Sequence, residues 1–156
     1  MIEQIKNLFS NYVLIATLVG WFFAQFFKMI ITLIKDRKFK PMLILFSSGG
    51  MPSSHTATVS ALFAASAIKF GFGSFEFAIS FILAMVVMTD AVGVRRETGK
   101  QAKVLNQIVE EMYLEDGDQS NDALKELVGH TPFQVAMGAV VGVGTAIVMA
   151  FIMNVL

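Results

Sequence analysis

The chain has 156 residues and a mass of 17.1 kDa; 55% of the residues are hydrophobic, only 15% are charged, and the mean hydropathy is +0.66. Soluble domains are typically about 45–50% apolar and about 25% charged, so this composition points to the lipid bilayer and away from disordered, collagen-like or disulfide-rich secreted proteins. Twelve basic and twelve acidic residues leave no net charge, which removes any case from bulk charge for a nucleic-acid partner, and the lack of cysteine excludes disulfides, iron–sulfur clusters and thiol nucleophiles.

Four apolar runs have the length of membrane-spanning helices, at residues 12–34, 54–70, 75–92 and 134–156. The first carries a single charge, Lys28, and at about 1.5 Å per residue it crosses a hydrocarbon core of roughly 30 Å. It is too long for a signal-peptide core and lacks a small-residue cleavage site, so we expect it to be retained. The second and third runs are joined by Gly71-Phe72-Gly73-Ser74, which predicts a tight antiparallel hairpin. We therefore predict one all-α domain, an integral membrane bundle of four transmembrane helices.

Residues 93–133 have an ordinary soluble composition, so we expect them at the membrane surface. Within them, 98–114 is predicted to be an amphipathic helix on the cytoplasmic face, because apolar residues recur there at helical spacing, namely Ala102, Leu105, Ile108, Val109 and Met112. An acidic loop at 115–121 and a short helix at 122–128 are expected to follow. The loop does not match a calcium-binding loop, because Asn121 stands where the sharp turn needs glycine.

Basic residues gather on one side of the predicted membrane. The first span is followed by Lys35, Arg37, Lys38 and Lys40, and the third by Arg95, Arg96, Lys100, Lys103 and Lys125, whereas the other side has Lys6 and Lys69. By the positive-inside rule both polar segments face the cytoplasm and both termini face outward, here across a bacterial plasma membrane. The same topology brings four stretches to the cytoplasmic mouth of the bundle: the end of the first span with Lys28, and residues 47–55, 90–103 and 129–134.

The loop SSGGMPSSHT at residues 47–56 has the composition of an anion site. Its glycines permit close backbone approach, Pro52 marks the start of a helix, and Ser53 and Ser54 are the predicted capping residues beside its first free amides. Unpaired N–H groups and the helix dipole attract negative charge to such an N-terminus. The alternative is a well-capped helix that binds no ligand.

Several charged residues near this mouth are candidates for holding a phosphate. Lys28 either extends to the lipid headgroups or points into the bundle toward a bound phosphate. Arg95, Arg96 and Lys100 either anchor the chain at the membrane surface or clamp a phosphoryl group, and only one of the two adjacent arginines is expected to face the site. Asp90 is expected to pair with a cation, and this structural role is favoured over general-base catalysis.

The chain has only two histidines, His55 and His130, and both stand at predicted helix starts on the same side of the membrane. Imidazole can attack phosphorus or donate a proton near neutral pH, so the pair supplies both halves of a phosphoryl transfer. Together with Asp90 the histidines would suit zinc or manganese, but nothing in their spacing demands a metal, and we predict neither a metal nor a cofactor.

In the fourth run, Gly138 and Gly142 form a small-xxx-small pair. Such pairs allow close helix packing, either within the bundle or between subunits, so a homo-oligomer formed through this face is one prediction.

Three segments together resemble the type 2 phosphatidic acid phosphatase superfamily, which includes vanadium haloperoxidases. They are GGMPSSHTA at 49–57, DAVGVRRETGKQAKVLN at 90–106 and GHTPFQVAMG at 129–138, and their combination is similar to the small divergent bacterial and plant branch of that superfamily. The resemblance implies that His130 is the nucleophile that forms a phosphohistidine and that His55 is the acid that protonates the leaving group. It also implies that Ser53 and the amides after it bind phosphate oxygen, and that no metal is required.

The sequence departs from the family pattern at several positions. Ser54 replaces the usual glycine, and Lys28 would take the part of a lysine from a family segment that is missing here. Leu124 stands in the place of an arginine, so Arg95 or Arg96 would have to reach the site from the third span. Gln134 stands in the place of the aspartate that orients the nucleophile.

These features predict an integral membrane phosphatase that hydrolyses a phosphomonoester or pyrophosphate of a lipid. The alternative is a catalytically silent membrane protein that binds lipid phosphates, which the substitutions at Leu124 and Gln134 would favour. A small transporter of a phosphorylated solute is a third hypothesis, and with four spans it would require an oligomer.

Overall fold

The computed structural model describes residues 2–36, 50–116, 124 and 129–156. These residues form helices and no strand, which confirms the predicted all-α class. The helices are α1 (Ile2–Phe9), α2 (Tyr12–Asp36), α4 (Ser54–Phe70), α5 (Phe75–Val92), α6 (Val94–Asp116) and α7 (Pro132–Ile152). The short helix expected at 122–128 and most of the acidic loop lie outside the described residues.

Three stretches of the described chain are long and apolar enough to cross a membrane: Tyr12–Ile34, Phe75–Glu111 and Pro132–Ile152. The second predicted span, α4, does not reach that standard, because it has 17 residues and is rich in serine and threonine. Its ends are set by the N-cap residue Ser53 and by Gly71, whose φ of 84° stops the helix. Three of the four predicted spans are thus confirmed as candidate spans, and the one that begins at Phe75 extends beyond its predicted end at residue 92.

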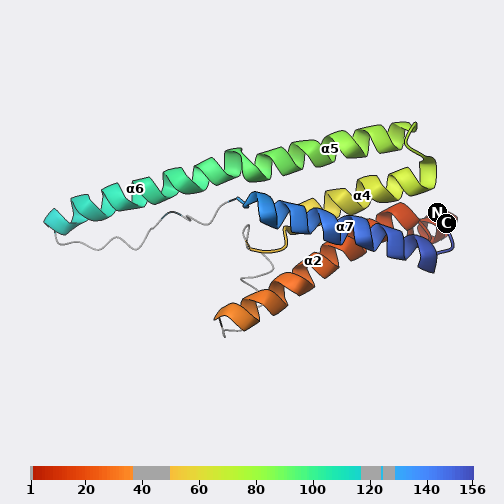
Figure 1. Ribbon diagram of the computed structural model, residues 1–156, viewed down its shortest axis with the longest axis horizontal. Coiled ribbons are helices and arrows are strands. Elements are labelled where there is room, and N and C mark those ends of the chain that lie inside the picture. The colour runs from red at the N-terminus through yellow and green to blue at the C-terminus, as the bar shows by residue number, and fades with distance from the viewer. Residues whose placement is uncertain (1, 37–49, 117–123, 125–128) are drawn as a thin grey trace.

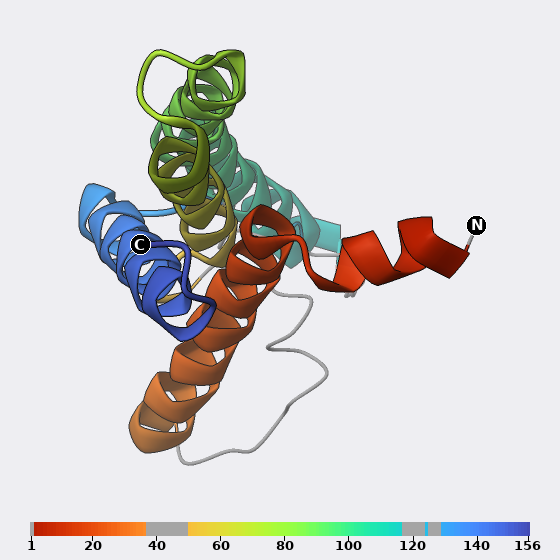
Figure 2. The same ribbon diagram turned by 90° about the vertical axis from the view of Figure 1, so that its right-hand side faces the viewer.

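Helix α4 is the central element of the bundle. It packs against α2, α5 and α7, and the end-on view in Figure 2 shows it between these three helices. Its buried residues are small, namely Ser54, Thr56, Ala57, Val59, Ser60, Ala61, Ala64, Ala65 and Ser66. Small residues let helix backbones approach closely, which is how helices associate where no water drives them together.

Glycines on the neighbouring helices complete this close packing. A Cβ atom placed at Gly20 of α2 would lie 2.9 Å from the Ala61 Cβ, and one at Gly138 of α7 would lie 2.5 Å from the Ser53 carbonyl oxygen. A Cβ at Gly142 would overlap the Ala57 carbonyl oxygen. The Gly138/Gly142 face is therefore buried within one chain, and it is not available for the predicted contact between subunits.

Tyr12 closes the end of the bundle that lies away from the start of α4. It is 2% exposed and donates a hydrogen bond to the Ala146 carbonyl oxygen at 2.8 Å. Its ring packs with alanines of α2, α4 and α7 in the main hydrophobic cluster. In Figure 1 both chain termini lie at this end of the long axis.

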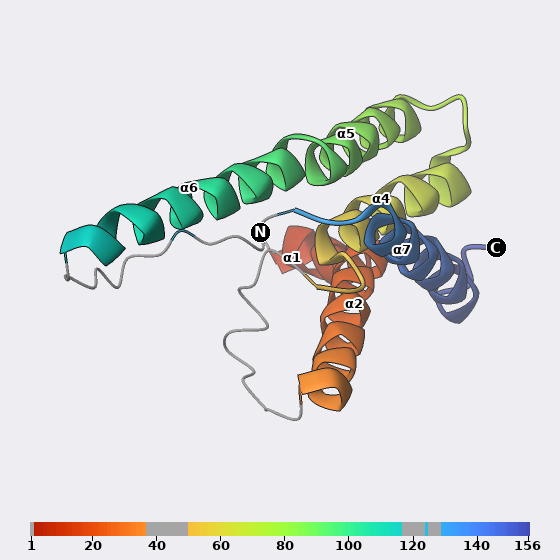
Figure 3. The same ribbon diagram turned by 60° about the vertical axis from the view of Figure 1, so that its left-hand side comes forward.

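The predicted hairpin between α4 and α5 is confirmed: the Ser74 side chain caps α5 by accepting from the Phe77 N–H at 3.1 Å. Helix α6 then continues almost in line with α5 after Gly93, and the two form one long rod that extends past the bundle (Figures 1 and 3). The helix predicted over 98–114 is confirmed and is longer at both ends.

Candidate active site

The structure brings four helix ends together at the mouth of the bundle, as the topology predicts. Gly50, before α4, packs on the side chain of Lys28 from α2. The Ser53 N–H donates to the Gln134 carbonyl oxygen of α7 at 3.2 Å, and the His130 N–H donates to the Ala91 carbonyl oxygen of α5 at 3.0 Å. These contacts between distant parts of the chain define the candidate site.

The N-terminus of α4 contributes buried polar side chains to this site. Ser53 is the N-cap residue and is fully buried; its Oγ accepts from the Thr56 N–H at 3.4 Å and from the Thr56 Oγ1 at 2.9 Å. Because both contacts use Ser53 Oγ as an acceptor, its own hydrogen is available to donate to an anion. Ser54 is the first helical residue and is not a second cap, and Thr56, which supports the serine, was missed in the sequence although it lies within the same PSSHT segment.

Lys28 is buried in the bundle, with 2% of its surface exposed. The burial favours the inward orientation over the extension to headgroups. Gly50 lies against its aliphatic stem, since a Cβ there would be 3.5 Å from Lys28 Cγ and Cδ, and the φ of 99° at Gly50 suits glycine alone. Within the described part of the chain, no carboxylate forms an ion pair with Lys28.

Among the described titratable groups outside the spans, His130 is the least exposed. It is 5% exposed, and neither Nδ1 nor Nε2 has a hydrogen-bond partner among the described residues. Burial, together with the positive charges of Lys28, His55 and Arg95, lowers the pKa of His130 from 6.5 to about 4. At neutral pH the imidazole is therefore uncharged, which is the form that a nucleophile needs.

Gly129 places His130 at this position by passing directly over the α5–α6 junction. A Cβ at Gly129 would lie 2.5 Å from the Arg96 backbone nitrogen and 2.7 Å from the Arg95 carbonyl carbon, and the residue has a φ of 88°. Only glycine allows this crossing. The sequence shows a glycine directly before His130, but it does not show that this glycine packs on the backbone of Arg95 and Arg96.

Gln134, at the position of the family's orienting aspartate, serves a different purpose in the structure. Its Oε1 accepts from the Thr131 N–H at 2.9 Å, while its own N–H donates to Thr131 Oγ1 at 3.3 Å. This reciprocal pair is a capping box that begins α7. The side-chain amide of Gln134 therefore caps α7, and it does not orient the His130 ring.

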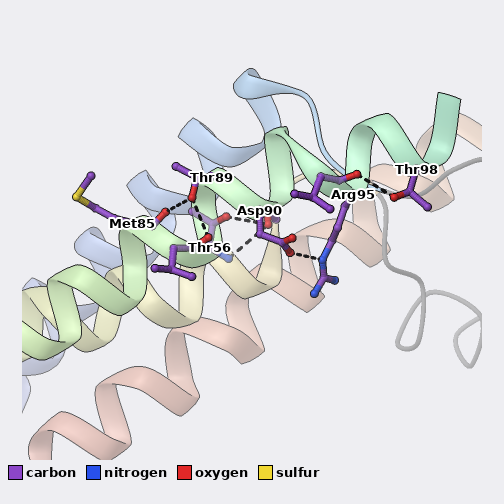
Figure 4. Close-up of polar contacts among 9 residues, drawn as sticks. Thr56, Met85, Thr89, Asp90, Arg95 and Thr98 are labelled. Atoms are coloured by element: carbon purple, nitrogen blue, oxygen red, sulfur yellow. Dashed lines mark hydrogen bonds and ion pairs between the residues drawn. The ribbon is translucent and has the colours of Figure 1, made fainter. Parts of the chain in front are cut away.

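Figure 4 shows Asp90 and Arg95 joined across the end of α5, with Arg95 Nε 2.5 Å from Asp90 Oδ2. Arg95 is therefore the cation that was expected beside Asp90, and its charge also acts on His130. The neighbouring hydroxyls of Thr89 and Thr98 donate to carbonyl oxygens of their own helices.

The remaining predicted residues lie around this pair. Arg96 is exposed and contributes its backbone to the Gly129 crossing. Lys100 pairs with Glu97 at 2.7 Å on the exposed surface of α6. His55, in the first turn of α4, is exposed and lies near enough for its charge to act on His130. Among the described residues, no three His, Asp or Glu side chains are grouped as metal ligands.

We expect acid to destabilise the fold through His130. Because its pKa is about 4 in the folded chain and about 6.5 when unfolded, only the unfolded state takes up this proton as the pH falls from 6.5 toward 4. The free energy of unfolding should fall by about 3 kcal/mol over that interval and should not change on this account above pH 6.5. Denaturation in detergent as a function of pH measures the loss, and it should shrink in His130→Gln.

Comparison with known proteins places the chain in a family. The model of the Divergent PAP2 family matches residues 9–145. The chain is also 38% identical over 155 residues to a protein of Bacillus subtilis (strain 168) described as an uncharacterized membrane protein, YuiD; the match covers 93% of this chain and 98% of that protein. No solved structure matches the chain.

Proposed function

We propose that the chain, which belongs to the Divergent PAP2 family, is a membrane phosphatase that hydrolyses a phosphomonoester or pyrophosphate of a lipid. The observation that supports this most directly is His130, a buried imidazole with both ring nitrogens unpaired among the described residues, beside Lys28, Arg95 and a helix N-terminus. A buried polar ring without a partner is costly unless a ligand completes its contacts.

In the proposed reaction a nitrogen of His130 attacks phosphorus, and the bond from phosphorus to the lipid oxygen breaks. His55 donates a proton to the departing alkoxide, so that the lipid leaves as an alcohol. Water then attacks the phosphohistidine, gives a proton back to His55 and releases phosphate with His130 restored. The attack uses the neutral imidazole of His130, which its lowered pKa favours. Burial, together with the positive charges of Arg95 and Lys28, also lowers the pKa of His55, so the proposal requires His55 to gain its proton when the negatively charged substrate binds.

The transferred phosphoryl group would be held by Lys28, by the Ser53 hydroxyl with the first amides of α4, and by Arg95. These donors are fixed before substrate arrives, because Lys28 and Ser53 are buried and Arg95 is held by Asp90. Positive groups placed in advance where charge develops are usually the largest contribution to such catalysis.

We further propose that α4 completes a bundle of four transmembrane helices and that the site faces the cytoplasm, where it would meet lipids of the inner leaflet. The short α4 suits this role because it is enclosed by α2, α5 and α7 and starts at the depth of the phosphate site. The orientation is supported by the basic residues that follow the first and third spans.

The test is release of inorganic phosphate by the purified protein in detergent. The substrates are phosphatidic acid, phosphatidylglycerol phosphate and an isoprenoid pyrophosphate, each with and without a chelator, for the native chain and His130→Ala. Release that survives chelation and is lost in His130→Ala is the expected result. Release that persists in His130→Ala would show that another nucleophile is used.

A silent lipid-phosphate binder is the second candidate, and the capping role of Gln134 favours it, because no described side chain orients His130. If none of the lipids yields phosphate while they still bind to the native chain, the binder is the better description.

A further inference from the structure

A cavity of about 460 Å³ lies between the start of α2, the end of α4 and the start of α5. Small-molecule sites are typically about 300–1,000 Å³, so this cavity is large enough to hold a ligand. It is at the end of the bundle where the hairpin joins α4 to α5, at the right of Figure 1. At about 1.5 Å per residue, the length of α4 places it roughly 24 Å from Ser53, so it is separate from the candidate active site.

The lining of this cavity changes from charged to apolar with depth. Three layers follow one another from the rim inward, each about one helical turn apart: Lys69 and Glu76, then Ser66 and Ser80, then Leu62 and Leu83. The candidate spans of α2 and α5 both begin at this end, at Tyr12 and Phe75. The charged layer therefore lies at the boundary of the membrane, and the leucines lie within its hydrocarbon region.

The rim carries one positive and one negative side chain. Lys69 and Glu76 are both exposed, and neither takes part in an ion pair within the described ranges of the chain. Lys69 Nζ lies 5.4 Å from the centroid of the Phe70 ring, which also lines the cavity. A ligand that brings an anionic and a cationic group to this rim would pair both charges.

The two serines of the middle layer differ in their hydrogen bonds. Ser80 Oγ donates to the Glu76 carbonyl oxygen at 2.7 Å, so its hydrogen is used within α5. Ser66 is 2% exposed, and its hydroxyl has no hydrogen-bond partner among the residues that the structure describes. A buried hydroxyl is rarely left without a partner, so Ser66 is available to donate to an acceptor that enters the cavity.

We propose that this cavity binds a zwitterionic phospholipid with an amine headgroup. Lys69 pairs with the phosphate and Glu76 with the ammonium group, while Ser66 donates to an ester carbonyl oxygen and the leucines contact an acyl chain. The order of these groups in the lipid, charged, then ester, then hydrocarbon, is the order of the three layers. This is a second lipid site, at the opposite end of the bundle from the candidate active site, and it does not depend on the proposed phosphatase activity.

The first measurement is the affinity of the delipidated protein for three lipids in mixed micelles, by mass spectrometry of the intact complexes. The probes are dioleoyl phosphatidylethanolamine, dioleoyl phosphatidylglycerol and dioleoylglycerol. Phosphatidylethanolamine should bind about fivefold more tightly than phosphatidylglycerol, because only the former has a cation for Glu76. Dioleoylglycerol, which lacks the phosphate, should bind more than tenfold more weakly than phosphatidylethanolamine.

The second measurement repeats these titrations with variants at two exposed positions of the lining, where substitutions are compatible with the fold. Glu76→Lys makes both rim charges positive, so it should reverse the preference to about fivefold in favour of phosphatidylglycerol. Leu83→Trp fills part of the cavity and should weaken the binding of both phospholipids about tenfold. The matched control is Glu3→Lys, the same charge change at an exposed residue of α1 that does not line the cavity; it should keep the native preference.

Three results would overturn the proposal. Equal affinities of the native chain for the two phospholipids, or a preference that Glu76→Lys leaves unchanged, would reject recognition of the headgroup by this rim. Affinities that Leu83→Trp leaves unchanged would place the lipid outside the cavity. None of these titrations requires hydrolysis, so a chain that releases no phosphate can still confirm this lipid site, and a failure here leaves the proposed phosphatase untouched.

Discussion

Gly142→Ala is expected to destabilise the bundle by about 3 kcal/mol, whereas Gly144→Ala, two residues further along α7, should stabilise it by up to about 1 kcal/mol. A methyl group at Gly142 would overlap the Ala57 carbonyl oxygen and lie 2.9 Å from the Ala61 nitrogen. Both atoms belong to the backbone of α4, so they cannot move aside as a flexible side chain would. At Gly144 nothing lies within 4 Å of the added atom, and alanine simply favours the helix.

Equilibrium unfolding in mixed detergent measures both effects under the same conditions. Equal midpoints for Gly142→Ala and Gly144→Ala would contradict the packing of α7 on α4. The comparison also concerns the site, because Gly138, one turn earlier on the same face, lies against Ser53. Gly142 lets α4 and α7 pack closely, and this close packing places Ser53 beside the start of α7.

The sequence was sufficient for the elements whose signals are local. Apolar length predicted α2, α5 and α7, the Gly71 to Ser74 link predicted the hairpin, and apolar spacing predicted α6. The order of the spans along the chain also predicted which helix ends meet at the mouth, because alternate connections lie on the same side of the bundle.

Features that depend on three-dimensional packing were not predictable. The central position of α4 results from its small residues meeting Gly20, Gly138 and Gly142, and a single sequence does not show whether such glycines face their own chain or a second one. The capping role of Gln134 was hidden for a different reason: a glutamine three residues after Thr131 suits a helix start and a histidine partner equally well. The distinction between Arg95 and Arg96 needed the geometry of the α5–α6 junction.

Lys28→Met is expected to stabilise the protein while it removes most of the proposed activity. A buried cation without an ion pair in the described part of the chain costs free energy of desolvation, which an apolar side chain of similar length does not incur. We expect a gain of about 1–3 kcal/mol in the free energy of unfolding. Loss of a fixed positive group at the phosphate site should lower kcat about 100-fold to 1,000-fold.

Lys6→Met is the matched control, because Lys6 is an exposed lysine in the last turn of α1, at the opposite end of the bundle. It should leave phosphate release unchanged and alter stability by less than about 0.5 kcal/mol. A stabilised Lys28→Met protein that has lost phosphate release is the result expected if the buried cation is retained for its ligand at a cost to the fold. A destabilised protein would mean instead that Lys28 supports the packing of Gly50 and the start of α4, and unchanged release would remove Lys28 from the phosphate site.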